Sequence, residues 1–441
     1  MEVLIKILQL ILALSILVLI HEFGHFIFAR IFKIRVEKFY LFFDPWFSLF
    51  KFKPKNSDTE YGIGWLPLGG YCKIAGMIDE SMDKEAMAKE PQPWEYRSKP
   101  AWQRFFVIFG GVLFNFILAI IIYTGIMFAW GEQYIKNTDV TTGIYAGELA
   151  YEMGFRNGDR IISFNGIEPE KFSDLQVELV RTQATEAKVL RNGDTVTVSI
   201  DPVYISAVLN TPGVFSYGIP FEILEVPDSS INANSGLMPK DRLMAINGTG
   251  CEMFYEAQKH LSSFKGDSIV ATIARDGELV LVPLATDTLG RIQVQVNNNL
   301  QDFYQVTQKE YTLVSAIPAG IRKATVTVSN YFKELKLIFT PKTEAYKSVG
   351  SFISIGKIFP GSWDWHSFWN ITAFLSVMLA VLNILPIPAL DGGHLVFTIY
   401  EMVTGRKPGD KFLEYAQMAG MILLLALMVL AFGNDIFRLF N

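Results

Sequence analysis

The sequence Ile-His-Glu-Phe-Gly-His-Phe at residues 20–26 places a His-Glu-x-x-His motif inside an apolar run that covers residues 7–29. The run is 23 residues long, which is enough to cross a bilayer as a helix, and its only ionisable side chains are those of His21, Glu22 and His25. A charged residue at the centre of a membrane helix costs about 2.5–3.5 kcal/mol. Three ionisable groups in one span therefore indicate a function or a partner, and a metal ion is the natural partner.

The spacing of the two histidines is typical of a metal site on a helix. His21 and His25 lie one turn apart on the same face, so both imidazoles can bind one ion while Glu22 reaches its bound water. This is the arrangement of zinc hydrolases, in which the glutamate is the general base. A chance motif on a buried helix is the alternative, but two of only five histidines in the chain flank this glutamate at the required spacing.

The composition is that of a membrane protein with soluble insertions. Hydrophobic residues make up 50% of the 441 residues, which is high for a soluble protein of this length. The formal net charge is −5 and no long basic tract is present, which argues against nucleic acid as a partner. Cys72 and Cys251 are the only cysteines, so we expect free thiols. The first apolar run has no small-x-small cleavage site, so we expect an uncleaved membrane helix.

Four apolar spans without lysine or arginine are predicted to cross the membrane as helices. They cover residues 7–29, 105–130, about 365–390, and 415–433. Residues 30–104 carry 13 lysines or arginines, whereas the outer flanks of the spans carry only Lys6 and Arg438. The positive-inside rule therefore places residues 30–104 and 395–414 in the cytoplasm, and both termini and residues 131–364 outside.

The cytoplasmic segment 31–104 contains a pattern of aromatic, aliphatic and glycine residues at 61–74 that predicts a β-hairpin at the membrane surface. Such a hairpin could offer a strand edge to an extended substrate. An ordinary surface hairpin fits the pattern equally well. In the second span, Gly110 and Gly111 predict a close helix contact, and Asn115 is expected to hydrogen-bond to a neighbouring helix.

The outer segment contains an internal repeat. Gly-Phe-Arg-Asn-Gly-Asp-Arg-Ile-Ile-Ser-Phe-Asn-Gly at 154–166 matches Gly-Leu-Met-Pro-Lys-Asp-Arg-Leu-Met-Ala-Ile-Asn-Gly at 236–248, with an offset of 82 residues throughout. Each copy predicts a short turn, a strand and an Asn-Gly turn. The two copies predict two similar β-rich domains.

Residues 306–364 are predicted to contain an amphipathic helix. Apolar side chains recur at helical spacing from Ile317 to Ile338, while lysines and arginines occupy other positions. This helix could lie at the outer surface of the membrane. Packing on the second β-rich domain is an equally good alternative. Pro318 is expected in the first helical turn.

A hydrolytic zinc site needs a third protein ligand and an open position for water. The third span ends in Asn-Ile-Leu-Pro-Ile-Pro-Ala-Leu-Asp-Gly-Gly-His at 383–394. Pro386 and Pro388 preclude a regular helix, and unwound backbone at membrane depth is tolerated only against protein or a watery cavity. Asp391 is therefore the best candidate ligand, since it follows this break at the same membrane depth as the first motif. His394 is the rival, but it lies further toward the cytoplasm and is assigned a loop or supporting role.

The two metal motifs together resemble those of the site-2 protease family of intramembrane zinc metalloproteases, and the resemblance covers essentially the whole chain. The tandem repeat makes the chain similar to the RseP type of this family, the regulator of sigma-E protease. The resemblance implies that His21, His25 and Asp391 bind one Zn²⁺ per chain and that Glu22 is the catalytic general base.

The same resemblance implies a fold and further site residues. We expect a multi-pass α-helical membrane protein with four transmembrane helices, two inserted β-rich PDZ domains and a membrane-associated β-hairpin. Gly69 and Gly70 would belong to the element that presents substrate in extended form, and Asn383 would hold substrate backbone. Two residues depart from the family pattern: Val112 stands where proline is usual in the second span, and Lys240 replaces glycine in the second repeat.

The predicted segments of the chain follow from these elements. They are transmembrane helix 1 with the first motif (1–30), a cytoplasmic or membrane-associated β region (31–104), transmembrane helix 2 (105–130), PDZ domain 1 (131–213), PDZ domain 2 (214–305), an amphipathic helical region (306–364), transmembrane helix 3 with the Leu-Asp-Gly-Gly-His motif (365–394) and transmembrane helix 4 (412–434).

The activity implied by the resemblance is hydrolysis of peptide bonds within transmembrane segments during regulated intramembrane proteolysis. Its substrates would be single-pass proteins that another protease has already shortened, such as anti-sigma factors and remnant signal peptides. The enzyme would be a monomer in contact with lipid of the bacterial cytoplasmic (inner) membrane, with both termini and the PDZ domains outside and the active site toward the cytoplasmic half. A membrane adaptor that docks partners through the repeats would leave Glu22 unexplained, and so would a transporter with broken helices.

Overall fold

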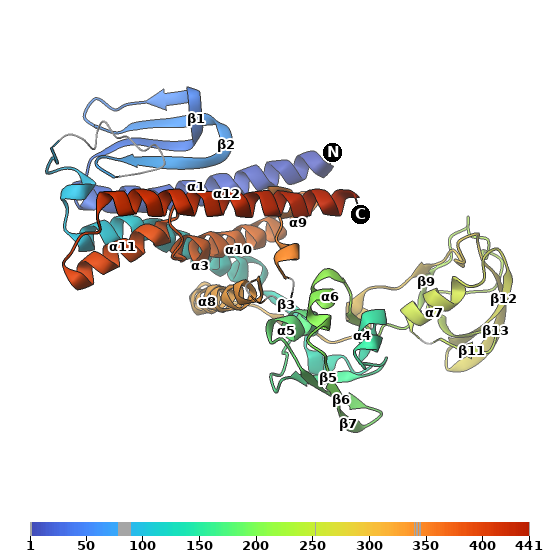
Figure 1. Ribbon diagram of the computed structural model, residues 1–441. Coiled ribbons are helices and arrows are strands. Elements are labelled where there is room, and N and C mark those ends of the chain that lie inside the picture. The colour runs from blue at the N-terminus through green and yellow to red at the C-terminus, as the bar shows by residue number, and fades with distance from the viewer. Residues whose placement is uncertain are drawn as a thin grey trace. The chain divides into compact units, whose positions relative to one another are not determined.

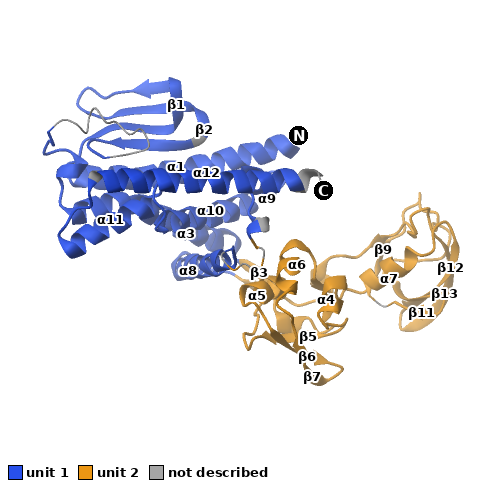
Figure 2. Cartoon of the chain, viewed as in Figure 1, with its two compact units in different colours: residues 1–131, 310–339, 346–441 blue, residues 132–309, 340–345 orange. Residues whose placement is uncertain are grey.

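The computed structural model describes residues 2–77, 90–251, 253–338, 340, 343 and 345–440 (Figure 1). Residues 78–89 of the predicted cytoplasmic β region lie outside the described residues. The chain separates into two compact units, which Figure 2 shows in different colours. Unit 1 comprises Met1–Gly131, Glu310–Phe339 and Tyr346–Asn441, and unit 2 comprises Glu132–Lys309 and Thr340–Ala345.

Unit 1 contains four helices that are long and apolar enough to cross a membrane. They are α1 (Glu2–Ile31), α3 (Ala101–Trp130), α10 (Trp365–Ile384) and, within α12 (Asp410–Phe440), the segment Lys411–Phe437. The described part of this unit also contains α8 (Leu313–Ile338), α9 (Phe352–Ile358) and α11 (Asp391–Thr404). The structure thus confirms the prediction of a membrane protein that has four candidate membrane-spanning helices and β-rich parts.

Helix α3 is the centre of unit 1, because it packs against α1, α8, α10 and α11. Glycines allow the closest crossing: a Cβ added at Gly24 of α1 would lie 2.2 Å from the carbonyl oxygen of Gly110 in α3. A Cβ added at Gly111 would lie 2.5 Å from Nε2 of His25. The predicted close contact at these glycines is confirmed, and the missing side chain at Gly111 leaves room for the imidazole.

Residues 61–74 were expected to form a β-hairpin, which is wrong, because they form one bent strand that pairs with the preceding strand. The two strands of this antiparallel sheet in unit 1 are β1 (Val36–Phe52) and β2 (Glu60–Ile74). Both strands are bent, so Leu41 of β1 lies opposite Ile63 in one part of β2 and opposite Gly70 in another. Positive φ angles at Phe42 (69°) and Trp46 (73°) let β1 turn back toward β2. Strand β2 also contacts α1, which brings the sheet against the helix that carries the first motif.

Unit 2 contains two β-rich modules between the paired strands β3 (Glu132–Ile135) and β15 (Val306–Lys309). The first module comprises β4 (Ile144–Ala146), α4 (Glu148–Glu152), β5 (Arg160–Phe164), α5 (Leu175–Arg181), β6 (Glu186–Arg191), β7 (Asp194–Ser199), α6 (Tyr204–Asn210) and β8 (Phe215–Tyr217). The second module comprises β9 (Ile223–Glu225), β10 (Arg242–Ile246), β11 (Thr249–Gly250), α7 (Phe254–Leu261), β12 (Ser268–Arg275), β13 (Glu278–Ala285) and β14 (Gln295–Val296). Their main sheets have the strand orders β5-β6-β7 and β11-β10-β12-β13.

The predicted repeat is confirmed in the local structure of both modules. Asp159 precedes β5 and Asp241 precedes β10, and both carboxylates are buried. Each accepts two hydrogen bonds of 2.7 Å from one guanidinium, that of Arg191 in the first module and that of Arg275 in the second. Because a buried carboxylate needs such a partner, this pair fixes the start of the repeated strand in each module.

Helix α8 packs its buried face against α3 and α10, where Ala324 is fully enclosed. The predicted helix is confirmed, and it belongs to unit 1. Pro318 was expected in the first turn, which is wrong, because α8 begins at Leu313 and Pro318 lies inside the helix. The earlier start follows from Thr312, whose carbonyl accepts the backbone N–H of Ala316 at 2.8 Å and begins the helical ladder.

Candidate metal centre

Three atoms of the kind that bind metals converge inside unit 1, two from α1 and one from α11. Nε2 of His21 lies 3.2 Å from Nε2 of His25 and 3.2 Å from Oδ2 of Asp391. Nε2 of His25 lies 3.5 Å from the same Asp391 oxygen. His21 and His25 are buried, and the Asp391 side chain is 17% exposed. The structure thus brings together the three residues that the sequence proposes as ligands.

These separations fit a tetrahedral zinc site. Bonds of about 2.0–2.2 Å from a zinc ion to nitrogen and oxygen place neighbouring ligand atoms about 3.3–3.6 Å apart. Three lone pairs directed at one point repel one another unless a cation lies between them. Oδ2 of Asp391 is buried and has no hydrogen-bond donor among the described residues. Three protein ligands also leave a fourth position for water, as in hydrolytic zinc sites.

Asp391 reaches this point because the chain breaks between two helices. Helix α10 ends at Ile384, and Pro386 and Pro388 keep the connection out of helical conformation before α11 begins at Asp391. The connection is tightly folded, since a Cβ added at Gly392 would lie 1.9 Å from a backbone carbonyl oxygen within it. The predicted break is confirmed, and it places the carboxylate at the start of a new helix.

The second ring nitrogen of each histidine is also engaged. Nδ1 of His25 donates to the carbonyl oxygen of Val107 in α3 at 2.9 Å. Nδ1 of His21 lies 3.1 Å from Nδ2 of Asn115, a fully buried carboxamide whose Oδ1 has no partner among the described residues. A histidine that binds metal through Nε2 carries its proton on Nδ1, so Asn115 must turn its oxygen toward this N–H. Both imidazoles are therefore held with Nε2 toward the cluster.

The sequence predicted a hydrogen bond from Asn115 to a neighbouring helix, which is confirmed, but not that the partner is a candidate ligand. No signal for this partner exists in the sequence, because the approach of Gly111 to both histidine rings, one helical turn before Asn115, is visible only in the structure.

Glu22 lies half-buried on α1 beside His21. Burial raises the pKa of the Cys72 thiol on β2, and the negative charge of Glu22 adds to this effect. Asn383, in the last turn of α10, has its Nδ2 3.4 Å from Nε2 of His21. Asn383 thus borders the cluster, while the roles of Glu22 as general base and of Asn383 in substrate binding stay predictions.

Gly69 and Gly70 lie in the part of β2 that contacts α1. A Cβ added at Gly70 would lie 2.8 Å from a methyl carbon of Val18, which is one turn before His21 on α1. A Cβ added at Gly69 would lie 2.7 Å from the ring of Phe43. The strand can approach α1 this closely because neither residue has a side chain; their contact with substrate stays a prediction.

His394 lies on α11 but outside the three-atom cluster. It lines a cavity of about 80 Å³ together with Tyr96, Arg104 and Glu401. The ion pair between Arg104 and Glu401, 2.5 Å long, joins α3 to α11 across this cavity. His394 lies on a helix rather than in a loop, and its supporting role stays a prediction.

Comparison with known proteins gives a consistent result over nearly the whole chain. The model of peptidase family M50 matches residues 9–427. A protein of Neisseria meningitidis serogroup A is 29% identical over 98% of this chain and 99% of its own length. A protein of Xylella fastidiosa is 28% identical over 97% of both chains, and one of Rickettsia conorii is 28% identical over 99% of both. All three relatives carry names that describe them as candidate zinc metalloproteases.

Proposed function

The chain belongs to peptidase family M50 and is a zinc metalloprotease of a membrane, and from this premise we propose that it hydrolyses peptide bonds within transmembrane segments. The proposed substrates are single-pass proteins that another protease has already shortened, such as anti-sigma factors and remnant signal peptides. The proposed location is the bacterial cytoplasmic membrane, with both termini and the two modules outside. The observation that carries the proposal is the convergence of His21, His25 and Asp391 among helices apolar enough to span a bilayer.

In the proposed reaction His21, His25 and Asp391 would hold one zinc ion per chain, and zinc, when bound, would lower the pKa of water at the site to about 7. Glu22 accepts a proton from the attacking water as the water oxygen bonds to the carbonyl carbon of the scissile peptide. Glu22 then donates the proton to the leaving amine, so one carboxylate serves both proton transfers.

The substrate must also change conformation before it is cut. A transmembrane helix hydrogen-bonds its own backbone, so the scissile carbonyl becomes accessible only when the helix unwinds locally. We propose that β2 near Gly69 and Gly70 receives the unwound segment as an added strand and that Asn383 hydrogen-bonds its backbone. The contact of Gly70 with α1 and the 3.4 Å distance from Asn383 to His21 support this assignment.

The proposal is tested with the purified full chain in liposomes and a single-pass substrate in two forms, one shortened and one with an intact folded outer domain. We expect the shortened form to be cut within its membrane segment, a chelator to abolish cutting, and added Zn²⁺ to restore it. Zinc content measured on the same samples should fall and recover in parallel. Equal cutting by metal-free protein would contradict the proposed mechanism, and no cutting by zinc-loaded protein would favour a membrane adaptor or a transporter.

We propose further that the two modules of unit 2 are PDZ domains that control access to the site. Folded modules on the outer side of the membrane would hinder membrane proteins that still carry a bulky outer domain. The internal repeat and the two β-rich modules support the assignment. A second candidate function, recruitment of a peptide, is favoured by one observation in the second module.

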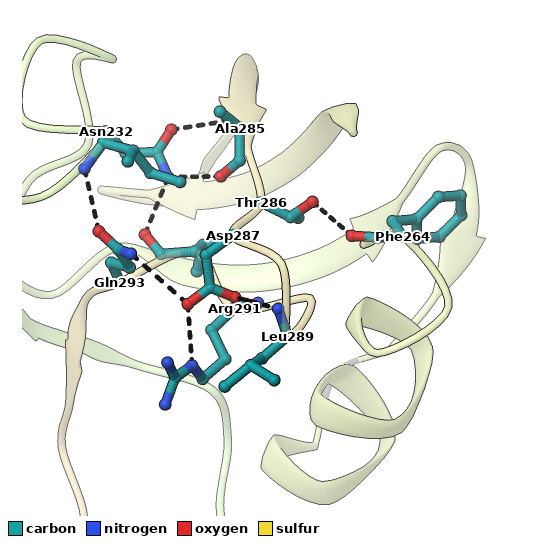
Figure 3. Close-up of polar contacts among 10 residues, drawn as sticks. Asn232, Phe264, Ala285, Thr286, Asp287, Leu289, Arg291 and Gln293 are labelled. Carbon is teal, nitrogen blue, oxygen red and sulfur yellow. Dashed lines mark hydrogen bonds and ion pairs between the residues drawn. The ribbon is translucent and has the colours of Figure 1, made fainter. Parts of the chain in front are cut away.

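That observation is an open groove of about 780 Å³ between α7 and the segment 289–296. Its apolar walls include Phe221, Phe254, Leu261, Leu289, Ile292, Val294 and Val296. The rim is a closed turn in which the carboxylate of Asp287 accepts the backbone N–H groups of Leu289 and Arg291 at 2.9 Å (Figure 3). The N–H of Arg291 is the main cause that lowers the pKa of Asp287 to about 2. Such a groove beside a strand suits an extended peptide.

The corresponding position in the first module is occupied by its own chain. Gln176 of α5 donates to the carbonyl oxygens of Val208 and Thr211, at 2.9 and 2.7 Å, and accepts the backbone N–H of Val214 at 3.2 Å. Gln258 of α7 stands 82 residues after Gln176, at the offset of the repeat, and lines the open groove. Its side chain has no hydrogen-bond partner among the described residues. We therefore assign peptide recruitment to the second module alone, with Gln258 as the residue that binds peptide backbone.

A further inference from the structure

A basic hollow of about 550 Å³ lies in unit 1 where α1 ends. It is lined by Arg30, Lys33, Ile34, Arg35, Asp58 and Trp94. Its lining includes three cationic residues and one acidic residue, a formal excess of two positive charges. None of these residues belongs to the candidate metal centre or to the proposed substrate path.

The end of α1 fixes the shape of this hollow. The N–H of Lys33 bonds to the carbonyl oxygen of Arg30 at 3.1 Å, and the N–H of Ile34 bonds to that of Ala29 at 2.8 Å. These two bonds form a Schellman closure, in which Lys33 occupies the left-handed position with φ of 57°. Glycine suits this position best, because an L side chain there is strained. The chain nevertheless has a lysine there, and this residue lines the hollow.

Arg35 contributes a hydrogen-bond donor that the protein leaves unused. Its Nε is buried and has no partner among the described residues. Its backbone is fixed on both sides, because its N–H donates to Trp94 at 3.0 Å and its carbonyl oxygen accepts from Ala75 at 2.9 Å. Its guanidinium pairs with Asp58, whose carboxylate oxygen lies 3.5 Å away in an exposed pair. The Arg35 side chain as a whole is 41% exposed, so its terminal guanidinium nitrogens can donate to an acceptor from outside the chain.

The position along the chain indicates what that acceptor is. The hollow follows directly after a helix that can cross a membrane and that ends at Ile31. Two indole rings occur near it, those of Trp94 (46% exposed) and Trp102 (48% exposed), and the ring of Phe32 packs 5.2 Å from that of Trp102. Exposed tryptophan beside a membrane helix is typical of the level of the lipid head groups. The anion that is abundant at this level is the phosphate of a phospholipid.

We propose that this hollow binds the head group of an anionic phospholipid, with Arg30, Lys33 and Arg35 donating to its phosphate. An anionic head group is favoured over a zwitterionic one, because the cation of choline or ethanolamine would meet walls with an excess of positive charge. Arg30 lies five residues after His25 on α1, so a bound lipid would also hold the end of the helix that carries both histidines. The same phosphate chemistry could be offered by inorganic phosphate, which the experiment must separate.

The test measures binding of short-chain phosphatidylglycerol to the full chain by native mass spectrometry. Short-chain phosphatidylcholine and inorganic phosphate serve as the other two probes. We expect phosphatidylglycerol to bind at least tenfold more tightly than phosphatidylcholine, and inorganic phosphate to bind weakly because it lacks the acyl chains. The triple variant Arg30→Gln, Lys33→Gly, Arg35→Gln should lose about fivefold in affinity for each cation removed.

A matched triple variant removes the same charge elsewhere. It combines Lys51→Gln, Lys53→Gln and Lys55→Gln. These three lysines lie on or just after β1, are exposed, and do not line the hollow. This variant should keep the affinity of the unmodified chain. Equal loss in both triple variants would show general charge attraction and overturn the proposed site. Binding of inorganic phosphate as tight as that of phosphatidylglycerol would overturn the lipid as ligand.

Lys33→Gly alone separates binding from folding. Glycine suits the left-handed position, so the melting temperature of this variant should be equal to or above that of the unmodified chain. Its affinity for phosphatidylglycerol should nevertheless fall about fivefold. Unchanged affinity in Lys33→Gly and in the triple variant would contradict the proposal.

Discussion

Asn115 of α3 and His21 of α1 meet through a contact of 3.1 Å between a fully buried carboxamide and Nδ1 of the imidazole. This contact decides which nitrogen of His21 faces the cluster, because the proton held at Nδ1 leaves Nε2 as the metal-binding atom. Val107 does the same for His25 through a backbone oxygen, which a side-chain substitution does not remove. Of the two groups that orient the histidines, Asn115 is therefore the one that a side-chain substitution can remove.

We predict that Asn115→Leu lowers zinc affinity about 10–100-fold, because His21 loses the acceptor that fixes its ring. Asn115→Asp should retain affinity, since a carboxylate oxygen can accept the same N–H. Competition with a chromophoric chelator measures both. Ser376→Ala is the control, because the Ser376 hydroxyl donates only to the backbone oxygen of Asn115. Affinity of Asn115→Leu equal to that of the unmodified chain would refute the positioning role.

Glu22→Gln should keep zinc and fold while cutting slows about 10²–10⁴-fold. The amide has nearly the shape of the carboxylate but cannot accept the proton of the attacking water. Zinc content and cutting of the shortened substrate are measured on the same preparation. Turnover close to that of the unmodified enzyme would remove Glu22 from the mechanism.

Asp391→Ala should lose zinc as well as activity, since one of three converging ligand atoms is gone. His394→Ala is the matched variant on the same helix, and it should keep its zinc because His394 lies outside the cluster. Metal analysis after dialysis distinguishes the two. Full zinc occupancy in Asp391→Ala together with loss of zinc in His394→Ala would show that His394, and not Asp391, is the third ligand.

Much of this site could be predicted from the sequence, because its features are local. The spacing of His21 and His25 requires only one helical turn, and the double proline before Asp391 requires only the chemistry of proline. The partner of Asn115 could not be predicted. A side-chain contact between two helices depends on how each helix is rotated about its axis. Here the close approach at the glycines sets that rotation, and no local sequence pattern encodes it.

The β1–β2 sheet and the two modules of unit 2 likewise could be predicted only in part. Strand β1 was not predicted as a separate strand, because its apolar residues do not alternate with polar ones, although Asp44-Pro45 between Phe42 and Trp46 is a turn signal in the sequence. In unit 2 the repeat was visible as a sequence offset, whereas the occupation of the first groove depends on side-chain contacts of Gln176 with residues more than 30 positions away.

Gly111→Ala should disrupt the metal centre, because its Cβ would lie 2.5 Å from Nε2 of His25 and 2.6 Å from Cε1 of His21. Gly125→Ala on the same helix is the control, since no atom lies within 4 Å of its added Cβ. We expect zinc affinity to fall at least tenfold in Gly111→Ala and to stay unchanged in Gly125→Ala, whose helix should be slightly more stable. Equal zinc affinity in the two variants would mean that α3 shifts to make room for the Cβ without moving the histidines.

Removal of both modules tests the proposed control of access. Ile135 of β3 lies opposite Val306 of β15, so a short turn can join these residues and leave the strand pair and unit 1 in place. If the modules exclude bulky substrates, this deletion variant should cut the substrate with the intact outer domain as well as the shortened one. Zinc content equal to that of the full chain is the check that unit 1 is folded. Continued resistance of the intact substrate would refute exclusion.

Recruitment by the second module is tested separately, because it concerns the shortened substrate. Gln258→Ala should raise KM for this substrate about fivefold with kcat unchanged, since one hydrogen bond to the bound peptide contributes about 1 kcal/mol. Gln176→Ala is the matched control, because the equivalent glutamine of the first module binds its own chain and should affect stability rather than KM. If Gln258→Ala leaves KM unchanged and the deletion variant cuts the shortened substrate at the full rate, the groove does not recruit, and exclusion remains the function of both modules.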